Sequence, residues 1–257
     1  MQPPLRRAAA RALAALGALA AASLLGACAT SSVRQHRDFA ARRGGIAAVA
    51  LVPARVEATR AAVGGARAPL REQALRVSER LPELLAAALE ERGMAGLELR
   101  LDAEAESSAL RRACRELDDA HARAGARLWS EVEMSEDEAL AFEASLGPPV
   151  RALAAPLGAD AVLLARYTAF DDAGADRDED EEEAASELLE AALGRARPPA
   201  GPQRGSLLEV ALADGRSGEI LWAHAAARSD PSERALEPLV RAVFAAFPAP
   251  TQDGVEP

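Results

Sequence analysis

An apolar run without charged residues, Ala12–Leu25, most limits what the start of this chain can fold into. Three arginines precede it: Arg6, Arg7 and Arg11. A transmembrane helix needs about 20 apolar residues, so the run is too short to span a bilayer comfortably. Its length and its basic flank are typical of a secretion signal. We therefore expect residues 1–27 to be a signal peptide that takes no part in the folded domain.

The run ends in Leu25-Gly26-Ala27-Cys28, which resembles the lipobox of bacterial lipoproteins. The small residues Gly26 and Ala27 let the backbone enter a peptidase cleft in extended form, and Cys28 supplies a thiol for a diacylglycerol. The resemblance implies signal cleavage between Ala27 and Cys28, acylation of Cys28 and anchoring in the membrane through its lipid chains. Ala29 follows instead of aspartate, which by resemblance to enterobacterial sorting favours the outer membrane, facing the periplasm. The alternative is a signal anchor with an accidental cysteine.

Charge and composition narrow the class of protein further. The chain has 257 residues, 30 basic and 40 acidic, and a net charge of −10. Removal of the signal peptide takes away three arginines and leaves −13. Such a chain repels phosphate, so we expect no nucleic-acid partner. With 49% hydrophobic but only 3% aromatic residues, its core must be built from Ala, Leu and Val. Two cysteines exclude a disulfide scaffold and a thiolate-rich metal site.

Hydrophobic periodicity predicts an α/β fold: one compact domain with a central mixed sheet of about five strands flanked by helices. Short apolar or alternating runs mark the strands, and apolar residues spaced by three and four mark the helices. The predicted strands are 46–52, 97–101, 160–168, 206–212 and 219–224. The predicted helices are 70–89, 107–128, a short one over 135–142, 150–157 and a last one from 231, after the N-cap Asp230, to 247. Pro82 should kink the first of these helices or start it afresh.

The rest of the chain divides around this domain. Residues 28–44 are polar and predict a membrane tether, residues 45–248 form the domain, and residues 249–257 predict a disordered tail. An acidic insertion, 171–204, interrupts the domain. Its first twenty residues hold eleven carboxylates and one arginine, and a block of like charge this dense normally stays solvated and mobile.

The acidic insertion contains weak candidates for calcium ligands. Positions 1, 3, 5 and 12 of an EF-hand-like loop would be Asp176, Asp178, Asp180 and Glu187. Glu181 stands where the loop needs glycine, and Glu183 stands where it needs an apolar residue. We therefore expect no specific metal site, and only diffuse attraction of divalent cations.

No known catalytic motif is present in the sequence. It contains no GxSxG, HExxH, CxxC or Walker-type loop. Cys114 and His121 are seven residues apart on one helix, about 10 Å, so they cannot bond directly and are better explained as core residues. His224, Ser229 and Asp230 invite comparison with a triad, but the last two fit the start of the C-terminal helix. We expect no catalytic residue and no cofactor, although forty carboxylates leave a paired-carboxylate hydrolase open.

Two segments, Leu157–Tyr167 and Asp214–Trp222, resemble a pattern in envelope lipoproteins. The families are the curli-secretion (CsgG-like) lipoproteins, the flagellar FlgO-like lipoproteins and the N-terminal domain of TolB. The resemblance implies a helix that ends at a Gly-Ala-Asp turn before a strand, and a later hairpin. The residues that carry it have structural roles: Gly158, Asp160, Asp214, Gly218 and Trp222. No alternating strands of about ten residues are present, so a pore is not expected.

These observations predict a lipid-anchored lipoprotein facing the periplasm. We expect a non-enzymatic assembly, accessory or binding factor with an envelope protein partner. Two alternatives stay open: an envelope hydrolase that uses paired carboxylates, and a calcium-responsive binding module built on residues 176–187.

Overall fold

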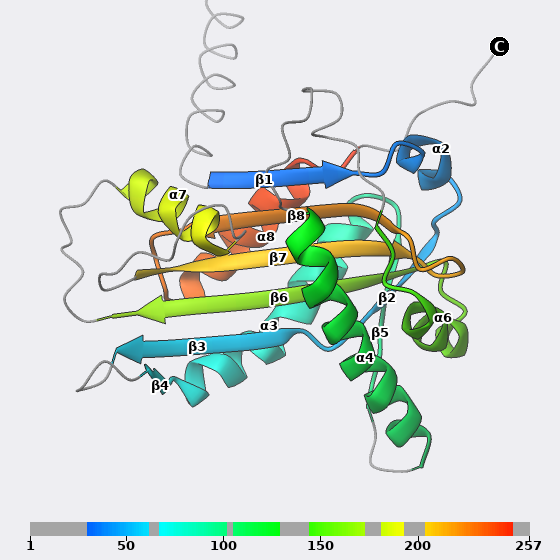
Figure 1. Cartoon of the computed structure of the whole chain (residues 1–257), viewed down its shortest axis with the longest axis horizontal. Coiled ribbons are helices and arrows are strands. Elements are labelled where there is room, and N and C mark those ends of the chain that lie inside the picture. The colour runs from blue at the N-terminus through cyan, green and yellow to red at the C-terminus, as the bar shows by residue number, and fades with distance from the viewer. Residues whose placement is uncertain are drawn as a thin grey trace, which may run out of the picture.

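The fold consists of one mixed sheet with helices on both faces (Figure 1). The computed structural model describes residues 30–61, 67–101, 105–128, 144–172, 181–192 and 204–248. Within these ranges the predicted α/β class and the single helix-flanked mixed sheet are confirmed.

The sheet contains eight strands within the described ranges, not about five. They are β1 (Thr30–Gln35), β2 (Ala48–Leu51), β3 (Arg55–Ala61), β4 (Arg67–Pro69), β5 (Ala95–Glu98), β6 (Ala161–Asp171), β7 (Arg204–Asp214) and β8 (Ile220–Arg228). The main order is β1-β8-β7-β6-β2-β5. The pairs β1–β8, β8–β7 and β7–β6 are antiparallel, and β2 runs parallel to both of its neighbours, β6 and β5. β3 runs parallel to the later part of β6, and β4 completes that edge.

All five predicted strands are present, and the three that were missed are β1, β3 and β4. The missed strands are rich in polar residues, and β4 ends at Pro69. β1 and β4 lie at edges, where backbone pairing on one side suffices and side chains can stay polar. Their sequences therefore show little of the alternation between apolar and polar residues by which strands are predicted.

The prediction of a tether over 28–44 is wrong for most of that segment. β1 pairs with β8 along its whole length, from Thr30 opposite Ala227 to Gln35 opposite Trp222. The helix α2 (Phe39–Arg43) follows and buries Phe39 completely in the core. Backbone pairing with β8 and the burial of Phe39 hold this segment on the domain, although its composition is polar.

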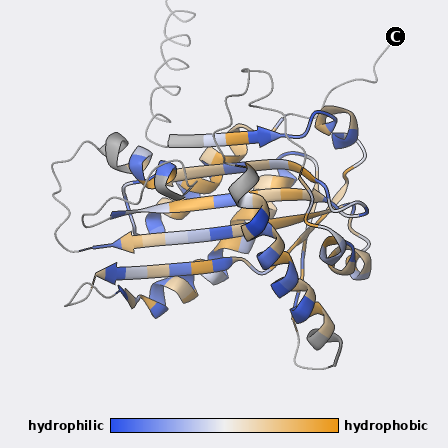
Figure 2. Ribbon diagram, viewed as in Figure 1, coloured by the Kyte–Doolittle hydropathy of each residue, from blue (hydrophilic) through white to orange (hydrophobic). Residues whose placement is uncertain are grey.

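Two hydrophobic clusters lie on the two faces of the sheet, and alternate residues of β6 and β7 point into each. One face is covered by α2, α3 (Arg71–Glu90), the short η2 (Glu233–Ala235) and α8 (Leu236–Ala245). The other is covered by α4 (Ala105–Leu128), α6 (Pro148–Ala154), η1 (Ala155–Leu157) and α7 (Glu181–Ala192). Figure 2 shows apolar residues gathered along the sheet and on the helix sides that meet it. Among the described residues, no helix is long and apolar enough to cross a membrane.

The first long helix runs through its proline. α3 continues past Pro82 as one helix, so the fresh start does not occur. Val77, Leu81, Leu85 and Leu89 are buried on both sides of the proline. Burial of this continuous stripe offsets the cost of the missing backbone hydrogen bond.

The prediction of a mobile insertion over 171–204 is wrong for its middle part. α7 packs against β1, β7 and β8, and it buries Ala185, Leu188 and Leu189. These three apolar residues recur at helical spacing within an acidic composition, which is why charge density alone misled the prediction. Residues 173–180 and 193–203 of the insertion, the predicted helix at 135–142, the signal peptide and the tail at 249–257 lie outside the described residues.

Candidate functional site

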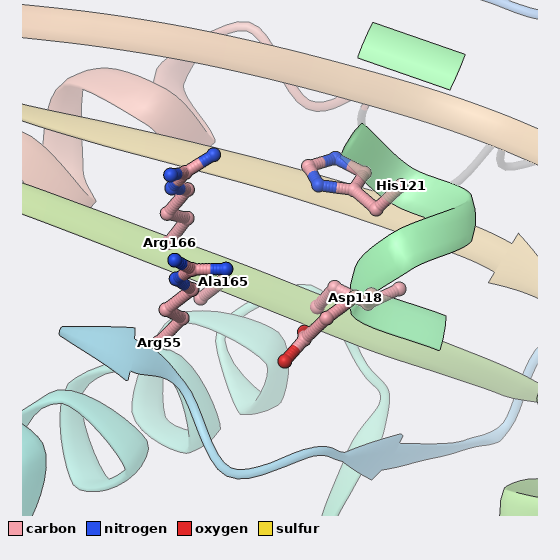
Figure 3. Close-up of a pocket in the computed structure, with 6 residues that line it drawn as sticks. Arg55, Asp118, His121, Ala165 and Arg166 are labelled. Carbon is pink, nitrogen blue, oxygen red and sulfur yellow. The ribbon is translucent and has the colours of Figure 1, made fainter. Parts of the chain in front are cut away.

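A cluster of charged side chains lies between α4 and the sheet (Figure 3). α4 crosses the sheet obliquely (Figure 1). Leu128 is the last residue of α4, and its carbonyl oxygen accepts a hydrogen bond from Arg34 Nε of β1 at 3.0 Å. The cluster consists of Arg55 from β3, Arg166 from β6, Asp118 and His121 from α4, and Glu209 from β7. We call these five residues the α4 cluster.

Strand register brings the sheet residues of the α4 cluster together. Arg166 lies directly opposite Glu209 in the β6–β7 pair, and Arg55 lies beside Arg166 in the β3–β6 pair. Because side chains alternate along a strand, all three project from the same face. α4 places Asp118 and His121 three residues apart, so that they share one side of the helix and face the arginines (Figure 3).

The two arginines share a further carboxylate. Arg55 donates from Nε to Glu57 Oε1 at 2.7 Å, and Arg166 approaches the same oxygen to 3.8 Å. The Nε of Arg166 is buried and has no hydrogen-bond partner among the described residues. The cluster therefore keeps one donor available under α4.

Burial and the two arginines shift the pKa values of the other three members of the cluster. Burial, with a smaller contribution from Arg166, lowers the pKa of His121 to about 4. Burial raises the pKa of Asp118, although Arg55 and Arg166 oppose the rise. Burial also raises the pKa of Glu209 against the effect of Arg166. Such perturbed groups gathered in one place are typical of functional sites, although structural ion-pair networks produce them as well.

The space at the α4 cluster limits its chemistry. The cavity lined by Arg55, Asp118, His121, Leu164, Ala165 and Arg166 has a volume of 20 Å³. That volume holds about one water molecule. A glycosidase needs room for a sugar between two carboxyl groups about 5–9.5 Å apart, and this cavity cannot admit one. The cluster therefore does not provide the cleft with two facing carboxylates that the hydrolase hypothesis requires.

The turn residues named from sequence lie at one end of the sheet. Gly158 ends η1 with φ 61°, in the left-handed region. Asp160 accepts hydrogen bonds from the backbone N–H groups of Ala47 and Ala48 at 2.9 and 3.0 Å. The residue thereby joins the turn before β6 to the start of β2.

The hairpin between β7 and β8 is closed by its own side chains. The Asp214 carboxylate accepts from the backbone N–H groups of Arg216 and Ser217 at 2.9 and 2.8 Å. These hydrogen bonds lower its pKa, although burial opposes the change. Gly218 has φ 74°, and a Cβ there would lie 2.6 Å from the carbonyl oxygen of Gly147. The hairpin therefore packs closely against the segment that begins α6.

Trp222 is fully buried in the centre of an aromatic group. Its ring centroid lies 4.9 Å from that of Phe247 and 5.8 Å from those of Phe244 and His224. His224 is also buried, and its Nδ1 bonds the carbonyl oxygen of Val243. Burial lowers the pKa of His224 although that hydrogen bond opposes the effect. His224 thus packs in the core. Asp230, the acidic residue of the triad comparison, accepts a hydrogen bond from the backbone N–H of Ser232 at 2.9 Å, near the start of η2.

The remaining candidates are split between described and undescribed parts of the chain. Ala27 and Cys28, and the calcium candidates Asp176, Asp178 and Asp180, lie outside the described residues. Glu187 is exposed on α7, where residues 181–187 are helical and do not form a ligand loop. In the part of the chain that the structure describes, no group of three His, Cys, Asp or Glu side chains is placed to hold a metal ion. Cys114 is a free, half-buried thiol whose pKa burial raises.

Sequence reasoning missed four of the five members of the α4 cluster, and it assigned His121 to the core. A signal was present for Arg166 and Glu209, because each is a lone charge inside a buried apolar strand. A charge at such a position is rarely buried without a partner. Arg55 and Asp118 carried no comparable signal, since both look like ordinary surface residues.

The described residues form a three-layer α/β domain, and the polar cavity at the α4 cluster is water-sized. No protein-family model matches the chain, and no curated protein matches it in sequence. A solved structure similar to the chain is the PelC dodecamer from Paraburkholderia phytofirmans, with 13% identity and a TM-score of 0.36, covering 86% of this chain and 96% of that one. Another is the C-terminal domain of LpoB from Salmonella enterica, with 13% identity and a TM-score of 0.28, covering 75% of this chain and 94% of that one. At these TM-scores the likenesses define neither a family nor a function for this chain.

Proposed function

We propose that this chain is a lipid-anchored lipoprotein of the bacterial envelope, attached to the outer membrane through Cys28 and facing the periplasm. In this role it is a non-enzymatic accessory factor that binds an envelope protein. The observation that carries the proposal is the position of Leu25-Gly26-Ala27-Cys28 relative to the fold. β1 begins at Thr30, so cleavage between Ala27 and Cys28 removes nothing from the sheet.

The α4 cluster does not favour a hydrolytic role. Its cavity has room for about one water molecule. Arg55 and Arg166 share Glu57, and Asp118 faces both arginines. The cluster thus offers no pocket for a polymer substrate.

Metabolic labelling with a fatty-acid analogue tests the anchor. The chain has two cysteines, which supply a matched pair of variants: Cys28→Ala and Cys114→Ala. The proposal predicts that label is lost from Cys28→Ala and kept by Cys114→Ala. Label that persists on Cys28→Ala contradicts the anchor.

Crosslinking in intact cells, followed by affinity purification, tests the accessory role. We expect an envelope protein to be recovered with the wild-type chain and depleted with Cys28→Ala, because the unanchored chain leaves the membrane surface. Recovery of no envelope protein with the wild-type chain would count against an accessory factor.

A further inference from the structure

The distance between Cys28 and the sheet is very short. One residue, Ala29, separates Cys28 from Thr30, where β1 begins. A fully extended chain advances about 3.3–3.6 Å per residue, so the two Cα atoms are at most about 7 Å apart. A lipid anchor at Cys28 would therefore leave no flexible tether between the bilayer and the domain.

The strand register identifies which residues share this end of the sheet. Thr30 lies opposite Ala227, the neighbour of Arg228 at the end of β8. Arg204 at the start of β7 lies opposite Asp171 at the end of β6. In Figure 1 the start of β1 lies on the left, with the start of β7 and the ends of β3 and β6. We call this the anchor end of the sheet.

The opposite end of the sheet is far away. β7 runs eleven residues from Arg204 to Asp214, and the turn that follows contains the exposed Arg216. At about 3.3 Å per residue, the strand separates the two ends by roughly 33 Å. If the strands stand upright on the membrane, this length holds the β7–β8 turn well away from the headgroups; if they lie flat, both ends touch it.

We propose that the anchor end of the sheet lies directly against the lipid headgroups, and that the β7–β8 turn points away from the membrane. This inference rests on the proposed acylation of Cys28. It differs from a tethered arrangement, in which the domain would tumble freely and present every face to the bilayer.

The charges at the anchor end fit a zwitterionic surface. Arg204 and Asp171 approach to 3.7 Å, and the partly buried Arg228 lies nearby. Asp171, at the end of β6, would meet like charge on a phosphate-rich anionic surface. Headgroups that carry both an amine and a phosphate offer partners for both signs.

Headgroup quenching measures the proposed seating. The full lipidated protein, with Cys114→Ala as background, is labelled with a fluorophore at Arg204→Cys or at Arg216→Cys; both positions are exposed. Each is reconstituted into vesicles of phosphatidylcholine and phosphatidylethanolamine that contain a headgroup spin label. We expect quenching at position 204 to exceed that at position 216 several-fold.

A linker variant separates direct seating from other causes of quenching. Insertion of twenty Gly and Ser residues between Ala29 and Thr30 gives a tether with a root-mean-square span of about 25 Å. We expect this insertion to abolish most of the difference between positions 204 and 216. A difference that survives the insertion undiminished shows that the short connection does not set the orientation.

Vesicle flotation distinguishes the two ways in which the inference can fail. A protein that floats with the vesicles but is quenched equally at both positions, or more at position 216, overturns the seating and leaves the anchor intact. A protein that does not float overturns the lipid anchor, and the seating with it.

Discussion

Asp160 accepts a hydrogen bond from the backbone N–H of Ala48 at 3.0 Å, across 112 residues of sequence. The same carboxylate oxygen accepts from Ala47. Replacement by alanine leaves two backbone donors at the start of β2 without this acceptor. We predict that Asp160→Ala lowers the free energy of unfolding by about 1–3 kcal/mol in urea denaturation. Asp160→Asn keeps one carbonyl oxygen and should lose less; an equal loss for both would contradict the hydrogen-bond explanation.

Gly218 and Gly125 make a matched pair of glycine substitutions. Gly218 has φ 74° and a Cβ there would meet backbone at 2.6 Å, whereas Gly125 lies in α4 with nothing within 4 Å of a Cβ. Gly218→Ala should destabilise the protein by about 2 kcal/mol or more. Gly125→Ala should stabilise it by about 0.5–1 kcal/mol. Thermal unfolding measures both; a tolerated Gly218→Ala would refute the close packing described for the hairpin.

The stability of the protein should depend on pH through His121. Its pKa is lowered to about 4 in the folded state, against 6.5 for the ordinary group. Between these values the unfolded chain binds a proton that the folded chain does not, so stability is complete above pH 6.5 and is lost as the pH falls toward 4. The loss from this one group is about 2 kcal/mol at pH 5.

Urea unfolding at pH 7.5 and pH 5 of the wild type and His121→Gln isolates this contribution. The variant should lose about 2 kcal/mol less than the wild type over that interval. Asp118 and Glu209 have raised pKa values and act in the opposite direction, which is why the two proteins are compared at each pH. Identical losses in both proteins would show that His121 titrates normally.

Arg166 contributes to the low pKa of His121 by its charge. Replacement of Arg166 by methionine should therefore raise the pKa of His121 from about 4 toward its ordinary value, because a nearby like charge is removed. Titration of the imidazole protons by NMR measures the change. Arg60→Met, at an exposed position on β3, serves as the control and should leave that pKa where it is. An unchanged value in Arg166→Met would mean that burial alone sets the titration.

The strands that could be predicted from the sequence are those with apolar residues on at least one face. β6 and β8 are buried over most of their length, and their largely apolar composition marks them clearly. β1 has the sequence Thr-Ser-Ser-Val-Arg-Gln and gains its place by backbone pairing with β8. Such pairing depends on the partner strand almost 200 residues later, which local periodicity does not report.

The α4 cluster illustrates a second limit of sequence reasoning. Asp118 and Arg55 are far apart in sequence and belong to elements whose packing is decided by Leu117, Ala124 and Leu128 under α4. Arg166 and Glu209 meet through strand register, which local sequence patterns do not fix. Asp160, by contrast, could be predicted to bond backbone donors because an Asp at a helix-to-strand turn has few other uses.

The proposed function depends on Cys28 being the lipid-modified first residue of the mature protein. Mass spectrometry of the N-terminal peptide, taken from protein purified out of bacterial membranes, tests it most directly. We expect a peptide that begins at Cys28 and carries a diacylglycerol on the sulfur and an acyl chain on the amino group. A peptide that begins elsewhere, or an unmodified Cys28, would contradict it.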